Sequence, residues 1–100
     1  MIKVSVLYPN GAGVKFDMAY YLAHHIPMVR QLLGASLKGV SVEHCIAAGS
    51  PAAYIATGHL LFDSVEAYQT SFGPHAKEIT DDIPKYTNSQ PTIQIGEVKL

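Results

Sequence analysis

The sequence predicts an α+β fold whose elements follow the order β-α-β-β-α-β. Four segments alternate apolar and polar residues with the period of a strand, and two segments between them have helical periodicity. This order is the split βαβ, or ferredoxin-like, arrangement, a four-stranded antiparallel sheet with both helices on one face. A chain of 100 residues suits one domain, so residues 1–100 are expected to form a single unit.

The first strand and the first helix are predicted from the N-terminal third of the chain. Residues 2–8 alternate, and the turn residues at 9–13 form a loop. Asp17, preceded by an apolar residue, is the expected N-cap of a helix that runs to about Leu33. Gly34 can close this helix.

The first helix is unusual because it carries two tyrosines, two histidines and a proline within eight residues. Helical spacing places Tyr21, His25, Met28 and Leu32 on one face. Pro27 lacks a backbone donor and disfavours helical geometry at the residue before it, which predicts a kink or break just after His25. Such a break would expose polar backbone near the imidazole.

A β-hairpin is predicted in the middle of the chain. Residues 37–47 and residues 53–62 both alternate, and Gly49-Ser50-Pro51 lies between them as a turn. The short connection implies that the two strands are antiparallel neighbours.

The second helix and the last strand complete the predicted order. Asp63 and Glu66 resemble a capping box ahead of a helix that the Gly-Pro pair at 73–74 ends. Residues 75–83 are expected to add one or two helical turns, and residues 92–99 to form the last strand.

Low charge predicts a homodimer. Charged residues make up 15% of the chain and hydrophobic residues 48%, whereas soluble domains typically have about 25% charged residues. Apolar residues also lie on both faces of some strands, as when Leu7 follows Val6 and Leu61 follows Leu60. We therefore expect two sheets to pack face to face as a two-fold dimer, forming a dimeric α+β barrel.

The remaining bulk properties exclude several classes of protein. The net charge is -1 with no basic run, so neither nucleic acid nor an anionic membrane is an expected partner. No apolar run approaches the ~20 residues of a membrane span. A single cysteine, Cys45, excludes an internal disulfide framework, and the N-terminus does not have the pattern of a signal peptide. A cytoplasmic location is expected.

The chain resembles the EthD family. The resemblance rests on Phe16, on Tyr20-Tyr21, on His25-Ile26-Pro27, and on the tail 82–91 running into Gly96-Glu97-Val98. It implies a dimeric α+β barrel. The family is named for a protein needed for bacterial degradation of ethyl tert-butyl ether beside a haem monooxygenase system. Related barrels include cofactor-independent monooxygenases, lactone isomerases and polyketide cyclases or dehydratases, and a shared fold does not fix the chemistry.

His25 is the first candidate catalytic residue, because an imidazole can take and return a proton near neutral pH. Tyr21, one turn earlier, is the second, as a hydrogen-bond donor that orients substrate. The structural alternatives are a neutral His25 bonded to a carbonyl freed by Pro27, and a Tyr21 that packs with its hydroxyl at the rim.

Four further residues are candidate substrate-binding residues. Tyr20 and Met28 lie on the same helix, and His44 shares an alternation face with apolar strand residues. Tyr86 belongs to the tail that resembles the family's C-terminal end, which could cap a pocket or contact a partner subunit. For Tyr20 and His44 a rim or structural role is the alternative.

No metal and no cofactor are expected. His44 and His59 lie on neighbouring strands, but two histidines without a third ligand do not make a convincing metal site. Gly11-Ala12-Gly13 follows a strand, yet Phe16 stands where a dinucleotide loop needs its last glycine.

Three functions remain open. The first is an enzyme or accessory protein that acts on a small, largely apolar organic molecule by oxidation without a cofactor, isomerisation or dehydration. The second is a non-catalytic binding or carrier dimer that serves a monooxygenase, and the third is a purely structural dimer. An enzyme should have an accessible histidine with a partner that orients it, a carrier should have a roomy apolar pocket, and a structural protein should have that space filled.

Overall fold

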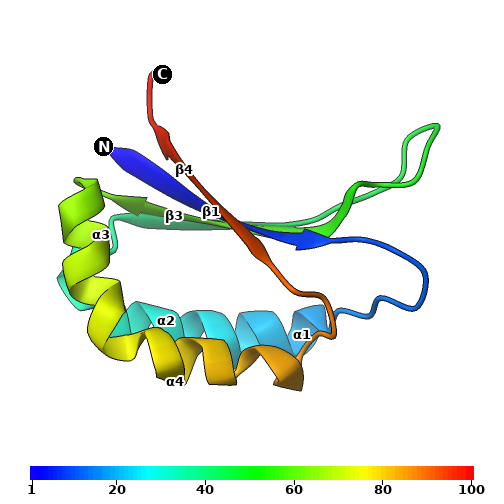
Figure 1. The fold of residues 1–100 in the computed structure, drawn as a ribbon, viewed down its shortest axis with the longest axis horizontal. Helices are drawn as coiled ribbons and strands as arrows, with labels where there is room; N and C mark the ends of the chain where they lie inside the picture. Colours follow the sequence, from blue (N-terminus) through cyan, green and yellow to red (C-terminus); the bar gives the residue numbers. More distant parts are fainter.

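A four-stranded antiparallel sheet carries helices on one of its faces in the computed structural model, which describes residues 1–100 (Figure 1). The predicted ferredoxin-like α+β fold is confirmed. The elements in chain order are β1 (Ile2–Pro9), α1 (Met18–Tyr20), a π-helical turn (Tyr21–His25), α2 (Ile26–Leu33), β2 (Gly39–His44), β3 (Tyr54–Phe62), α3 (Val65–Phe72), α4 (Ala76–Asp81) and β4 (Thr92–Glu97).

The strand order β2-β3-β1-β4 places β1 and β3 in the centre of the sheet. Val4 pairs with Leu60 on β3 and with Ile95 on β4, and this row faces the helices. Because side chains alternate along a strand, the next row, in which Ser5 pairs with His59, faces the opposite side. The register therefore decides which histidine lies on which face.

Two apolar clusters pack between the sheet and the helices. The larger cluster holds Val4 and Phe62 of the sheet against Val29 and Leu33 of α2. The smaller cluster is mostly aromatic and lies at the other end of the helix; it consists of Tyr8, Tyr21, Ile26, Ala56 and Tyr86. Burial of these side chains provides the main stabilisation of the fold, at about 1.5–3 kcal/mol for each large apolar side chain.

The first helix widens near Pro27 instead of breaking, so the predicted kink after His25 is wrong. Ile26 keeps helical geometry, and its N–H donates to the carbonyl of Tyr21, five residues earlier. A π-helical turn of this kind inserts one residue into the helix, and such turns are common at functional sites. It accommodates the proline, which lacks an N–H and would crowd the carbonyl four residues before it.

The π-helical turn also changes which residues face the sheet. Tyr21 and His25 are buried as predicted from their spacing, but Val29 and Leu33 then follow them inward. Met28 and Leu32, expected on that face, are only half-buried. One inserted residue rotates the following helix by about 100° relative to the preceding one, which accounts for the shift.

The start of α3 differs from the predicted capping box of Asp63 and Glu66. Ser64 is the N-cap, and its hydroxyl accepts a hydrogen bond from the N–H of Ala67. Serine in extended geometry satisfies a free donor of the first turn as well as aspartate does. Beyond α3, a short 3-10 turn at Gly73–His75 leads directly into α4, and a second one at Ile83–Lys85 includes Pro84.

The strand β4 is the least covered part of the sheet. It is exposed along its length, and Ile93 and Ile95 are 53% and 43% exposed although they lie in rows that face the helices. In Figure 1, β4 crosses in front of β1, and the strand order makes it an edge strand of the sheet. One side of the space under the helices is therefore open.

The face of the sheet opposite the helices carries a hydrogen-bonded polar chain. His59 contacts Ser5 through Nδ1 and Glu43 through Nε2, both at 2.9 Å, and Thr57 donates to the same Glu43 oxygen. Leu7 and Leu61 lie half-buried on this face. The face is thus more polar at its centre than the alternation of apolar residues predicted.

No helix of the chain combines the length and the apolar character required to cross a bilayer.

Candidate functional site

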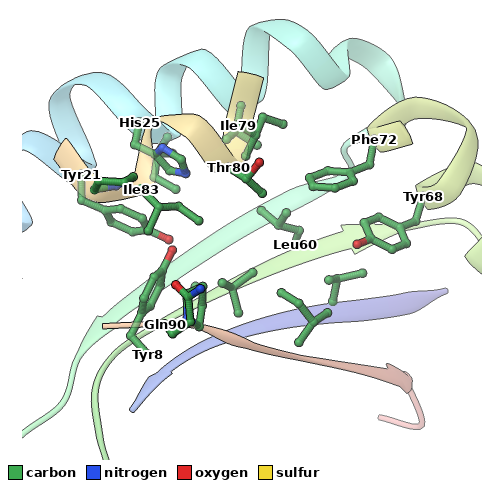
Figure 2. A pocket seen from close by; sticks show the side chains of 18 residues that line it. Tyr8, Tyr21, His25, Leu60, Tyr68, Phe72, Ile79, Thr80, Ile83 and Gln90 are labelled. Atoms are coloured by element: carbon green, nitrogen blue, oxygen red, sulfur yellow. The ribbon is translucent and has the colours of Figure 1, made fainter. Parts of the chain in front are cut away.

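A cavity of about 490 Å³ lies between the helices and the sheet (Figure 2). Its walls come from β1, β3, the first helix, α3, α4 and the segment that leads into β4. The lining residues are Val4, Val6, Tyr8, Tyr21, His25, Ile26, Val29, Gly58, Leu60, Tyr68, Phe72, Ile79, Thr80, Ile83, Pro84, Gln90, Pro91 and Ile93. This volume is within the range of small-molecule sites, which is about 300–1,000 Å³.

His25 lines the cavity and is held by a carboxylate on its far side. The imidazole is 4% exposed, and its Nδ1 lies 2.9 Å from Oδ2 of Asp82, which follows α4. An ionised carboxylate can only accept, so Nδ1 carries the proton and Nε2 is the unprotonated nitrogen, which can accept. This arrangement orients a neutral imidazole as a base.

A second contact fixes the carboxylate itself. The Tyr20 hydroxyl donates to Oδ1 of Asp82 at 2.9 Å, and the Lys85 ammonium lies 3.8 Å from the same oxygen. The Tyr20 ring also stacks on the ring of Tyr86 and packs at a tilt against the ring of His24. Both oxygens of Asp82 are therefore occupied, so the carboxylate cannot rotate away from His25 without losing a hydrogen bond.

Burial and charge act in opposite directions on this pair. Burial lowers the pKa of the His25 imidazole below its ordinary value, although the hydrogen bond to Asp82 opposes the change. Burial alone would raise the pKa of Asp82, but the hydrogen bonds from His25 and Tyr20 outweigh it and hold that pKa below its usual value. At neutral pH the pair is therefore a neutral imidazole and an ionised carboxylate.

Three tyrosines pack at this end of the cavity, and one of them, Tyr86, contacts the unprotonated nitrogen of His25. The hydroxyls of Tyr8 and Tyr86 are 2.6 Å apart, and the Tyr86 hydroxyl lies 3.5 Å from Nε2 of His25. Figure 2 shows the hydroxyls of Tyr21 and Tyr8 pointing toward each other at this end of the cavity. Burial raises the pKa of all three phenols, so they are protonated hydrogen-bond donors at neutral pH.

Tyr21 reaches the sheet because a glycine lies opposite its hydroxyl. Gly58 occupies the middle of β3, between Val6 of β1 and Val42 of β2. A methyl group at this position would lie 2.4 Å from the Tyr21 oxygen. Glycine inside a strand weakens it and often marks the close approach of another group. Here the approaching group is the Tyr21 phenol, which also stacks on the His25 ring.

Only two of the six residues predicted for the site line the cavity. His25 and Tyr21 both line it, whereas Tyr20 and Tyr86 stand behind the lining, on Asp82 and on Tyr8 respectively. Met28 is half-buried against the larger apolar cluster and does not line the cavity. His44 is exposed on the edge strand β2 and does not line it either.

Tyr8, Gly58 and Asp82 belong to the site, yet sequence reasoning did not select them. Tyr8 looked like an ordinary inward residue of the first strand, and Gly58 like one position of an alternating run. Asp82 lies in the tail that carried the family resemblance, which was a usable signal. Its partner is 57 residues away in sequence, so only the packing of α4 against the first helix reveals the pair.

A metal-binding cluster is not found. No three histidine, cysteine, aspartate or glutamate side chains lie close enough together to hold an ion. His44 pairs with Ala56 in a row that faces the helices, and His59 pairs with Ser41 in a row that faces the opposite side. The register therefore keeps these two histidines apart.

The EthD domain model matches residues 11–90 of the chain. This range includes His25, Asp82 and Tyr86, and it covers most of the protein.

The chain belongs to the EthD family.

Solved structures agree with this assignment. The chain is similar to an EthD-like protein from Ralstonia eutropha JMP134, with 39% identity over 99% of this chain and 92% of the other and a TM-score of 0.90. It is also similar to an EthD family protein from Bacillus halodurans C-125, with 20% identity, 99% of each chain covered and a TM-score of 0.76.

More distant neighbours share the fold alone. A protein from Bordetella bronchiseptica, assigned as an antibiotic biosynthesis monooxygenase, superposes with a TM-score of 0.67 at 16% identity, covering 99% of this chain and 97% of that one. No curated protein sequence matches the chain significantly.

Substitution of Gly58 tests the close approach of Tyr21. Gly58→Ala places a methyl group against the phenol oxygen, so we expect a loss of about 1–3 kcal/mol in the free energy of unfolding. Tyr21→Phe removes that oxygen, and in this background the added methyl should destabilise much less. Urea unfolding of the wild type, both single variants and the double variant gives the coupling energy. Equal losses in both backgrounds would show that Tyr21 does not limit position 58.

The lowered pKa of His25 predicts that stability falls on acidification. The unfolded chain binds a proton at His25 near pH ~6.5, whereas the folded chain resists it, so protonation favours unfolding below that pH. Between about pH 7.5 and 5.5 protonation of this residue should lower the free energy of unfolding. The drop should be smaller in His25→Gln, with His75→Gln as a control outside the cavity. Parallel pH profiles of the wild type and His25→Gln would contradict this.

Proposed function

We propose that this EthD-family protein is an enzyme that moves a proton on a small, largely apolar organic molecule, with His25 as the acid/base residue and Tyr21 orienting the substrate. One observation carries the proposal: His25 lines the cavity while Asp82 holds its Nδ1 at 2.9 Å. A histidine kept only for packing would not need a carboxylate that is itself fixed by a second residue.

The proposed chemistry follows from the protonation state of the pair. Nε2 of neutral His25 takes a proton from a carbon next to a carbonyl or from a hydroxyl group. Asp82 stabilises the imidazolium that forms, and the phenols of Tyr8 and Tyr21 donate hydrogen bonds to the oxygen that becomes negative. Apolar walls exclude water and strengthen these interactions. Isomerisation, dehydration and cofactor-independent oxidation share this proton-transfer step.

A carrier remains the second candidate because the polar atoms of the site are already paired. No buried side-chain nitrogen or oxygen lacks a hydrogen-bond partner. Such a pocket can hold an apolar compound for a monooxygenase without reacting with it. A carrier would bind its ligand and catalyse no proton exchange.

The proposal includes a cytoplasmic homodimer formed through the face of the sheet opposite the helices. Leu7 and Leu61 would be covered there, and the Ser5, His59 and Glu43 chain would meet its symmetry mate. The polar centre has its own hydrogen bonds, so burying it does not leave unpaired groups. An association with a monooxygenase system is part of the proposal for the carrier.

Proton exchange is the direct test of the enzyme. We expect the protein to catalyse deuterium incorporation into an enolisable bicyclic ketone such as 2-tetralone, measured by NMR in D₂O. His25→Gln should lower the rate by about 100- to 10,000-fold while the dimer remains folded, because general acid–base groups typically contribute that much. Asp82→Asn should lower it less, and His44→Gln should have no effect. Binding of the ketone without exchange would favour the carrier, and exchange unaffected by His25→Gln would refute the assignment.

Analytical ultracentrifugation tests the dimer. We expect a dimer at micromolar concentration, with an interface above ~1,000 Å² in total. Leu61→Glu places a charge on the sheet face opposite the helices and should shift the protein to monomer. Thr70→Glu, on the exposed side of α3, is the matched control and should leave the dimer intact. A monomeric wild type would exclude this part of the proposal.

A further inference from the structure

The cavity wall carries no charged side chain. None of its 18 lining residues is lysine, arginine, aspartate or glutamate, and 12 of them are hydrophobic. Its polar groups are neutral donors or acceptors, the phenols, the imidazole, and the Thr80 and Gln90 side chains. A ligand that enters with a full charge would therefore lose its hydration without gaining a partner of opposite charge.

The polar groups are not spread evenly along the cavity. Figure 2 shows Tyr8, Tyr21 and His25 together at one end, and Tyr68 and Phe72 of α3 at the other, with Leu60 between them. A ligand with a single polar end and an apolar body fits this arrangement. Its polar end would lie against the phenols and the imidazole, and its body between the aromatic rings of α3 and the sheet.

The negative charge behind His25 acts against an anion. The hydrogen bonds from Tyr20 and His25 keep Asp82 ionised, and its cationic neighbour Lys85, at 3.8 Å, is 67% exposed, so solvent screens that ion pair. A ligand that arrives as an anion meets this negative charge across a neutral imidazole. A ligand that arrives protonated does not, and after its proton moves to Nε2 the new anion faces an imidazolium. The site therefore favours the protonated form of an acid over its conjugate base.

We infer that the cavity selects uncharged weak acids, phenols or enolisable ketones with a single oxygen at one end of an apolar ring system, and rejects carboxylates and phosphates. The inference rests on the proposed function, since it names the substrate class of the same site.

The proton transfer balances without an oxidant or reductant. The O–H bond of a phenol, or the C–H bond beside a ketone, breaks and leaves its electron pair on the ligand. The N–H bond forms at Nε2 of His25. The ligand oxygen then carries the negative charge and accepts hydrogen bonds from Tyr8 and Tyr21, while the positive charge on the imidazolium lies beside Asp82.

The mouth of the cavity supports the same class. Gln90, Pro91 and Ile93 line it at the edge where β4 is uncovered, and Ile93 and the neighbouring Ile95 are exposed. An apolar body can contact these side chains before it enters, whereas no cation there would attract an anion.

Three probes of the same ring size test the inference: naphthalene, 2-naphthol and 2-naphthoate, titrated by isothermal calorimetry at neutral pH. We expect 2-naphthol to bind about three- to tenfold more tightly than naphthalene, because it gains one net hydrogen bond. We expect 2-naphthoate to bind at least about 100-fold more weakly than 2-naphthol. His25→Gln should reduce the preference for 2-naphthol and leave naphthalene binding unchanged.

A positive charge introduced at the mouth of the cavity tests the inference independently. Gln90 is exposed, so Gln90→Lys can place an ammonium at the mouth without disturbing the core. If the absence of a cation excludes carboxylates, this variant should bind 2-naphthoate at least about tenfold more tightly than the wild type. Gln90→Met has a similar length without the charge and should show no gain.

The outcomes distinguish a wrong substrate class from a wrong proposed function. Wild-type binding of 2-naphthoate as tight as that of 2-naphthol would overturn the inference and leave an apolar binding site. Equal affinity for naphthalene and 2-naphthol would also overturn it, and would leave the carrier function. Failure of all three probes to bind would overturn both the inference and the proposed function.

Discussion

The contact between His25 and Asp82 connects the two parts of the chain that form the site. His25 lies at the end of the π-helical turn, and Asp82 follows α4, so their hydrogen bond joins the first helix to the C-terminal half. Tyr20 adds a second bond between the same two segments. The pair also keeps a charge next to a cavity that has none of its own. Removing either partner would leave a buried polar group unpaired, which makes this contact important to the fold as well as to the proposed chemistry.

The local geometry of the helix makes this contact possible. A regular α-helix containing Pro27 would bend, and the face that begins with Tyr21 and His25 would continue through Met28. The π-helical turn keeps the helix continuous and brings Val29 and Leu33 under it instead. The same helix thus supplies polar groups of the cavity wall at its N-terminal end and core residues at its C-terminal end. The two clusters of apolar residues reflect this division.

The sequence was sufficient for the order of elements along the chain, for the family, and for placing Tyr21 and His25 on one face of the first helix, because these depend on periodicity and on a local motif. His25 and Tyr21 are one helical turn apart, and their spacing is enough to place them together. Asp82, Tyr8 and Gly58 were not predicted because their roles depend on contacts across the sheet and between distant segments. Met28 was misplaced by a one-residue insertion in the helix, which no hydrophobic pattern reports. The N-cap at Ser64 was missed because Asp63 beside it satisfies the same rule.

The exposed strand β4 lies apart from the residues that keep the protein folded, although its edge lines the cavity. Phe62, Val4 and Tyr8 are almost fully enclosed, and they hold the sheet to the helices. Ile93 and Gln90 touch the cavity yet contribute little to that enclosed core. Residues of this edge can therefore change with little loss of stability, while the pairing of His25 with Asp82 and the enclosed core stay untouched. Members of one family could in this way acquire different ligands while the histidine, the carboxylate and the fold remain as they are.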